Sequence, residues 1–145
     1  MKLQRNFRWF KMELFCINDF KVEFEKLKSK KSYNTLEEET ISYFFNKSAD
    51  ELLSGVRLNN SDSAPYIKKR LAGRGGFRFY YLLIVKGDAL YLIFVHPKTG
   101  AYGAENITDE SKAFLYKKVL KCIESGDLFK LSLDQTKSRI IFEAL

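Results

Sequence analysis

Histidine, cysteine and proline are scarce in this chain of 145 residues, which has one, two and two of them. The cysteines, Cys16 and Cys122, lie far apart within apolar runs and lack the CxxC spacing of metal and redox sites. With a single histidine beside them, the usual four ligands of a zinc site can hardly be assembled. We therefore expect two reduced core cysteines, no metal and no cofactor.

Long apolar runs are lacking as well. The basic N-terminus has no uninterrupted apolar stretch of signal-peptide length and no small-residue cleavage site. The longest apolar run elsewhere, residues 77–85, contains Arg78 and falls far short of the roughly 20 residues that span a bilayer. We therefore expect a cytoplasmic protein that makes no contact with a membrane.

The common enzyme motifs are missing too. The sequence contains no GxSxG, Walker loop, dinucleotide fingerprint or HExxH, and its GRGG stretch lacks the following GK[ST] of a phosphate loop. The sequence therefore gives no motif that supports one of these common enzyme classes.

Basic and aromatic residues, in contrast, are plentiful. Lysine and arginine outnumber aspartate and glutamate by 25 to 18, which gives a net charge of +7, and 15% of the residues are aromatic. The aromatic content predicts a folded chain, because burial of so much apolar area offsets the entropy cost of ordering. RNA, an acidic protein or an anionic membrane would all suit the charge, and so would a solvated surface without a partner.

Apolar periodicity predicts the helices. An apolar stripe at helical spacing starts after Asn18 or Asp19. Thr35 followed by Glu38 resembles a capping box for a second helix to about Lys47, and Ser48 is a candidate cap for a further turn. A later amphipathic helix is predicted to begin after a cap at Thr108 and to end at Ser125 and Gly126. Residues 1–12 fit a strand, an arm or a wrongly assigned start equally well.

Strands are predicted between these helices and at the C-terminus. Residues 77–85 and 89–95 form two apolar runs separated by Lys86, Gly87 and Asp88, a hairpin signal. The tail alternates around residues 131–133 and 140–142, which predicts a final hairpin. The order of elements predicts an α+β fold: a small curved antiparallel β-sheet flanked by helices, which we expect on one face, with a C-terminal β-hairpin extension. We expect a single domain over residues 1–145, with its core at about 13–125 and the extension at 126–145.

The densest positive charge lies between Pro65 and Arg78, where the sequence PYIKKRLAGRGGFR contains no acid. If residues 66–71 form a strand, Lys68 and Arg70 share one face, and on the next strand Arg78 and Tyr80 share a face while Phe77, Phe79 and Tyr81 face the core. Such a surface suits phosphate. Lys69, Arg74 and Tyr80 are the further candidates for phosphate binding. A face rich in lysine and arginine that serves only solubility and edge protection is the alternative interpretation.

His96 is the only histidine and lies at the end of the predicted strand LYLIFVHPK. A strand that pairs with the Arg78 strand places His96 and Lys98 near the same basic face, where an ordinary histidine pKa of about 6.5 suits proton transfer. An ordinary surface or hydrogen-bonded histidine is the alternative.

The stretch from Gly73 to Lys121 resembles the C-terminal half of RelE-type toxins, especially the HigB branch. The resemblance covers roughly residues 65–124, and the helices before it fit only in their order. The matching residues are Gly75, Gly76, Arg78, Tyr80, Tyr81, Tyr91, Leu92, Lys98, Glu105, Asn106 and Thr108. The His96–Gly100 corner departs from the pattern, since relatives often have a basic run there.

The resemblance implies the toxin of a type II toxin–antitoxin pair: a metal-independent endoribonuclease that cuts mRNA, commonly on the ribosome, by attack of a 2′-hydroxyl on the adjacent phosphate. By position, Arg78 would clamp the phosphate, Lys68 and Arg70 would activate the nucleophile or neutralise charge, Lys98 would assist, and His96 would transfer a proton. An acidic antitoxin would be the protein partner. A non-enzymatic ParE-like toxin that binds gyrase and a basic RNA-binding module without catalysis are the alternatives.

Overall fold

The computed structural model describes residues 11–71, 76–99 and 107–145. The described strands form one sheet of seven strands in the order β2-β3-β4-β5-β1-β6-β7. Every pairing is antiparallel except that of β1 with β5, which is parallel. The strands are β1 Glu13–Cys16, β2 Val56–Arg57, β3 Tyr66–Leu71, β4 Phe77–Ile84, β5 Ala89–Pro97, β6 Phe129–Leu133 and β7 Ile140–Ala144.

The helices follow the predicted order. They are α1 Asn18–Lys28, the 3-10 turn η2 Lys31–Tyr33, α2 Leu36–Phe44, α3 Ala49–Leu52 and α4 Asp109–Ser125. Thr108 caps α4 by accepting a hydrogen bond from the Ser111 N–H, and Gly126 ends the helix in the left-handed region at φ 77°. Among the described residues, no helix is long and apolar enough to cross a membrane.

The other two predicted caps have different outcomes. Thr35 precedes α2 but has φ −92° and ψ −3° instead of an extended backbone, and its hydroxyl donates to Glu39 Oε2 at 3.0 Å. The capping box predicted there is therefore wrong. Ser48 does cap α3, where its N–H donates to Glu51 Oε1 at 2.9 Å.

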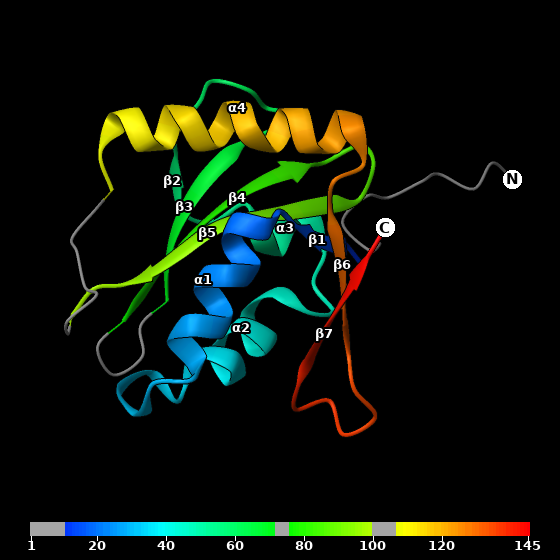
Figure 1. Cartoon of the computed structure of the whole chain (residues 1–145). Coiled ribbons are helices and arrows are strands. Elements are labelled where there is room, and N and C mark those ends of the chain that lie inside the picture. The colour runs from blue at the N-terminus through cyan, green and yellow to red at the C-terminus, as the bar shows by residue number, and fades with distance from the viewer. Residues whose placement is uncertain (1–10, 72–75, 100–106) are drawn as a thin grey trace, which may run out of the picture.

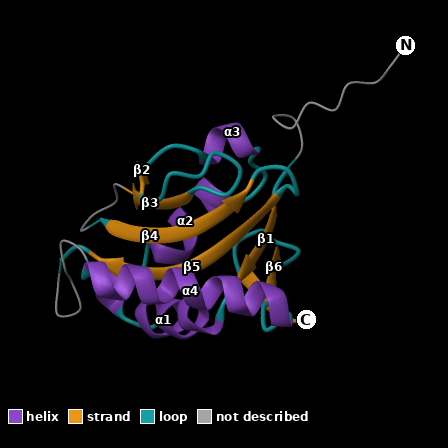
Figure 2. Cartoon of the chain, turned by 90° about the horizontal axis from the view of Figure 1, so that it is seen from above, coloured by secondary structure: helices purple, strands orange, loops and turns teal. Residues whose placement is uncertain are grey.

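Helices cover both faces of the sheet, so the expectation of helices on one face is wrong. Figure 1 shows β3, β4 and β5 between α4 on one side and α1 and α2 on the other, and Figure 2 shows the curvature of β4 and β5. Phe79 and Tyr81 pack with the apolar residues of α1 and α2, whereas Tyr80 and Leu82 pack with those of α4. The physical reason lies in β4, which is apolar at nearly every position and therefore needs cover on both faces.

The predicted C-terminal hairpin is present as β6 and β7, and it joins the main sheet through the pairing of β6 with β1. Leu131 and Ile140 are buried in the core shared with α1 and α2. The ring of Phe142 lies 5.8 Å from that of Phe24 in α1. The hairpin therefore completes the layer that buries α1.

Candidate anion-binding site

The sheet register brings the predicted basic residues together on three neighbouring strands. Lys68 pairs with Tyr80, Arg70 pairs with Arg78, and Arg78 pairs with His96. Directly opposed residues point to the same face of a sheet, and so do residues two apart. The five side chains therefore share the face that α4 covers, as the strand spacing predicts.

Most of these side chains are buried, although the sequence suggested an open face. The exposed fraction is 4% for Arg78, 5% for His96 and 6% for Lys68, and Tyr80 is fully buried. We name these four residues the basic cluster. Of the four, Tyr80 packs with the apolar residues of α4, whose Tyr116 ring stacks on Tyr66 at 5.2 Å, on the same strand and face as Lys68.

Arg70 and Lys98 are exposed and lie at the rim of the basic cluster. The Lys98 N–H donates to the carbonyl of Gly76 at 3.0 Å. Gly76 has φ +62°, and a side chain there would meet Arg78 Nη1 at 3.6 Å and Lys98 Cβ at 3.9 Å. The guanidinium therefore extends back past the Gly76 backbone, toward the strand end that carries Lys98.

His96 has both ring nitrogens engaged. Nδ1 lies 3.0 Å from the carbonyl oxygen of Pro97, which can only accept, so Nδ1 carries the proton. Nε2 is then an acceptor, and the Tyr80 hydroxyl donates to it at 3.1 Å. The two rings also stack, with centroids 5.6 Å apart. His96 is therefore held as one neutral tautomer, oriented by Tyr80.

The environment keeps His96 neutral. Burial lowers the pKa of His96 below its ordinary value of 6.5, and the nearby Arg78 and Lys68 charges lower it further, against the opposing effects of the Pro97 carbonyl and Glu23. Burial also raises the pKa of the Tyr80 hydroxyl. His96 is thus a proton acceptor rather than a proton donor at neutral pH.

Arg78 is the unusual member of the basic cluster. Its Nε is fully buried and has no hydrogen-bond partner within residues 11–71, 76–99 and 107–145. A buried donor without an acceptor costs about 1–3 kcal/mol, and more when the group is charged. Buried guanidinium groups are normally paired with carboxylates or phosphates. The geometry at Arg78 is therefore that of a cation prepared for an anionic ligand.

One predicted phosphate-binding residue, Lys69, is not part of this arrangement. Lys69 points to the opposite face, where its Nζ donates to Ser54 Oγ at 2.9 Å and lies 5.3 Å from the centre of the Tyr43 ring. Lys69 therefore does not share the face of Lys68 and Arg70, because alternate residues of a strand point to opposite faces, and its role in phosphate binding stays a prediction. Arg74 lies outside the described residues.

Sequence reasoning missed Phe94. It pairs with Tyr80 across β4 and β5, is half-buried, and its ring lies 6.4 Å from that of His96. Its position two residues before His96 on the same strand was the available signal. An aromatic ring beside a phosphate-binding group is the usual arrangement for stacking a nucleobase.

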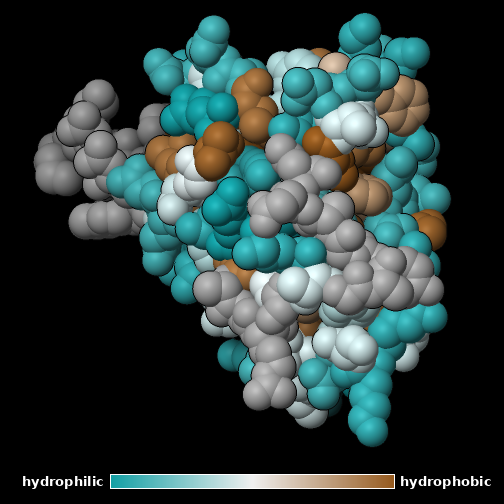
Figure 3. All heavy atoms as spheres, turned by 90° about the vertical axis from the view of Figure 1, so that its left-hand side faces the viewer, coloured by the Kyte–Doolittle hydropathy of each residue, from teal (hydrophilic) through white to brown (hydrophobic). Residues whose placement is uncertain are grey.

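One side of the molecule carries the ends of β3 and β5 and the start of β4, where the basic cluster lies. Figure 3 shows this side, and hydrophilic residues make up most of its coloured surface. Within the described parts of the chain, no group of three or more histidine, cysteine, aspartate or glutamate side chains is arranged to hold a metal ion.

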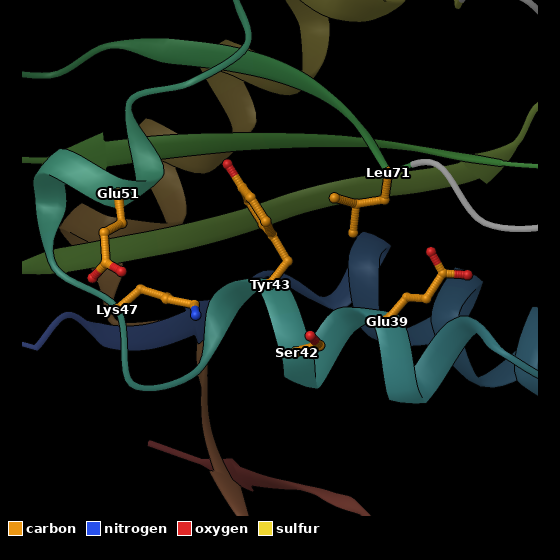
Figure 4. A pocket seen from close by; sticks show the side chains of 6 residues that line it. All are labelled: Glu39, Ser42, Tyr43, Lys47, Glu51 and Leu71. Carbon is orange, nitrogen blue, oxygen red and sulfur yellow. The ribbon is translucent and has the colours of Figure 1, made fainter.

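A separate pocket of about 420 Å³ lies on the α2 side of the sheet. Figure 4 shows its lining residues, Glu39, Ser42, Tyr43, Lys47, Glu51 and Leu71. Two of its three charged groups are carboxylates, and a hydrogen bond from the Ser48 N–H lowers the pKa of Glu51. This pocket therefore does not suit phosphate and is distinct from the basic cluster.

No family model matches the chain, and no curated protein matches it either.

Proposed function

We propose that this protein is the toxin of a toxin–antitoxin pair of the RelE/HigB type and that it cleaves mRNA at the basic cluster. The observation that carries this proposal is Arg78, a buried guanidinium whose Nε lacks a partner among the described residues. The resemblance of residues 65–124 to RelE-type toxins connects this anion-binding geometry with RNA.

The proposed reaction is a transesterification within the RNA strand. The 2′-oxygen attacks the adjacent phosphorus while the bond from phosphorus to the 5′-oxygen breaks, which leaves a 2′,3′-cyclic phosphate and a 5′-hydroxyl. Arg78 and Lys68 neutralise the additional negative charge of the five-coordinate phosphorus in the transition state. Preorganised cations in a buried site are effective at this because the solvent does not screen them.

The hydrogen bond between Tyr80 and His96 provides a path for the proton. The 2′-hydroxyl gives its proton to Tyr80 Oη as Tyr80 passes its own proton to His96 Nε2, which is neutral and already accepts that hydrogen bond. The leaving 5′-oxygen takes a proton from an ammonium group, Lys68 or Lys98. Arg70 and Lys98, exposed at the rim, bind the flanking phosphates.

We further propose an acidic antitoxin as the protein partner. A protein of opposite charge associates quickly with a chain of net charge +7 and competes with RNA for the exposed cations at the rim.

The test uses purified full-length protein and labelled mRNA, alone and on translating ribosomes, and compares the wild type with Arg78→Gln and Lys69→Gln. We expect defined cuts from the wild type, at least 100-fold slower cutting by Arg78→Gln, and normal cutting by Lys69→Gln, whose side chain lies on the other face. Intact mRNA in both settings would refute the enzyme. Binding without cuts would instead favour an RNA-binding module, and DNA damage with intact transcripts would favour a gyrase-directed toxin.

A further inference from the structure

A lysine-rich segment at the end of α1 lies near the strand ends that carry the basic cluster, on the opposite face of the sheet, although it is far away in the sequence. Residues 26–34 read KLKSKKSYN and contain four lysines and no acid. Tyr33 joins this segment to the end of β5, because its hydroxyl donates to the Thr99 carbonyl at 2.9 Å and its ring lies 6.1 Å from that of Phe77. The segment therefore lies next to the strand end that carries His96 and Lys98.

The four lysines differ in their position relative to the helix end and in their exposure to solvent. Lys26 and Lys28 belong to the last turn of α1, where their positive charge interacts favourably with the negative end of the helix dipole. Lys26 pairs with Glu23 at 3.1 Å, and Lys28 pairs with Glu37 at 3.6 Å. Lys30 and Lys31 lie beyond the end of the helix, so the dipole does not account for them. Lys31 is exposed at the start of η2 and Lys30 is half-buried.

A hollow of about 430 Å³ continues from this segment toward the C-terminal hairpin. It is lined by Lys28, Ser29, Asn34, Glu37, Ser138 and Arg139. Glu37 is the one acid among these residues, and it is already occupied by Lys28 and by the N–H of Ile140 at 2.9 Å. Lys28 pairs with Glu37, and the Ser29 hydroxyl donates to the Lys26 carbonyl at 2.7 Å. Arg139 and Asn34 add a guanidinium and an amide, which are donors that contact phosphates in nucleic-acid interfaces.

We propose that Lys30 and Lys31 bind backbone phosphates of an RNA strand as it leaves the basic cluster past Lys98. This inference rests on the proposed function and extends it. The protein holds a run of several nucleotides, and the cluster contacts only the reacting phosphate. The segment adds affinity without sequence preference, because phosphate contacts position a strand and do not read its bases. Figure 1 shows the turn between α1 and α2, the start of β4 and the end of β5 on the same side of the molecule.

The experiment measures the salt dependence of binding to a short fluorescein-labelled 2′-O-methyl oligouridylate, which lacks the attacking hydroxyl and stays intact. Each phosphate contact on a single strand contributes about 0.7 to the slope of log K against log salt. The variant Lys30→Gln/Lys31→Gln is expected to lower that slope by about 1.4, for two contacts. The control is Lys86→Gln/Lys121→Gln, which removes the same charge from exposed positions in the β4–β5 turn and on α4.

A slope that stays unchanged in Lys30→Gln/Lys31→Gln, or that falls equally in the control, overturns the inference. Binding of inorganic phosphate separates it from the proposed function. The lysine pair should leave phosphate binding unchanged, whereas Arg78→Gln should abolish it. If Arg78→Gln binds phosphate as the wild type does while the lysine pair still lowers the slope, the assignment of the basic cluster fails and the contact of the strand with Lys30 and Lys31 stands.

Discussion

At the scale of single residues, Arg78 is the position where function and stability conflict. Its buried Nε has no acceptor within the described residues, which costs free energy, and replacement of a buried charged group by an apolar side chain of similar volume is often stabilising. We expect Arg78→Met to raise the free energy of unfolding by about 1 kcal/mol or more and to abolish the stabilisation by added phosphate. Urea denaturation with and without phosphate measures both. Arg70→Met, at the exposed neighbouring position, should change stability by less than about 0.5 kcal/mol. Destabilisation by Arg78→Met would mean that the guanidinium is structural.

His96 predicts a pH dependence with a definite sign. Because its pKa is lower in the folded protein than the ordinary 6.5, the unfolded chain binds the proton first as pH falls. The contribution of His96 to stability is therefore complete above pH 6.5 and is lost as pH falls below it, by at most about 1.4 kcal/mol per pH unit. Denaturant titrations at several pH values measure this loss, and His96→Gln should remove it. An equally steep loss in that variant would contradict the assignment to His96.

At the scale of elements, one predicted helix cap is confirmed and another is wrong. The hydroxyl of Thr108 accepts the Ser111 N–H, whereas Thr35 makes no cap bond. We expect Thr108→Ala to lower the free energy of unfolding by about 1 kcal/mol and Thr35→Ala to lower it less, as measured by urea denaturation. Equal losses would show that Thr35 caps α2 in solution.

Local patterns predicted the β4–β5 hairpin and the main helices because caps, turns and apolar spacing are properties of neighbouring residues. They did not predict which face of the sheet a helix covers. The apolar stripe of α4 specifies only that the helix packs, so the burial of Tyr80 beneath it and of Arg78 and His96 next to Tyr80 could not be predicted from the sequence. Likewise, the alternation of residues 66–71 predicted that Lys68 and Arg70 share a face, yet Lys69 was still grouped with them as a phosphate-binding candidate because of its charge.

At the scale of the whole molecule, long-range pairing was the least predictable feature. The parallel pairing of β1 with β5 joins residues far apart in the sequence, and β6 reaches β1 across almost the whole chain. No spacing rule within either segment specifies such a partner, because pairing depends on the complete set of faces that need cover.

The place of the C-terminal hairpin in the sheet predicts different effects at two neighbouring isoleucines. Ile140 is 7% exposed and Ile141 is 46% exposed. We expect Ile140→Ala to lower the free energy of unfolding by about 2–5 kcal/mol and Ile141→Ala by about 0.5 kcal/mol or less, as measured by urea denaturation. Similar small losses at both positions would show that the hairpin does not share the core.

The central claim is that the basic cluster cleaves RNA through attack by the 2′-hydroxyl. Mass spectrometry of the ends of the RNA fragments tests it most directly. The account predicts 2′,3′-cyclic phosphate and 5′-hydroxyl ends from the wild type and none from Arg78→Gln. Fragments with 3′-hydroxyl and 5′-phosphate ends, or the same fragments from Arg78→Gln, would contradict it.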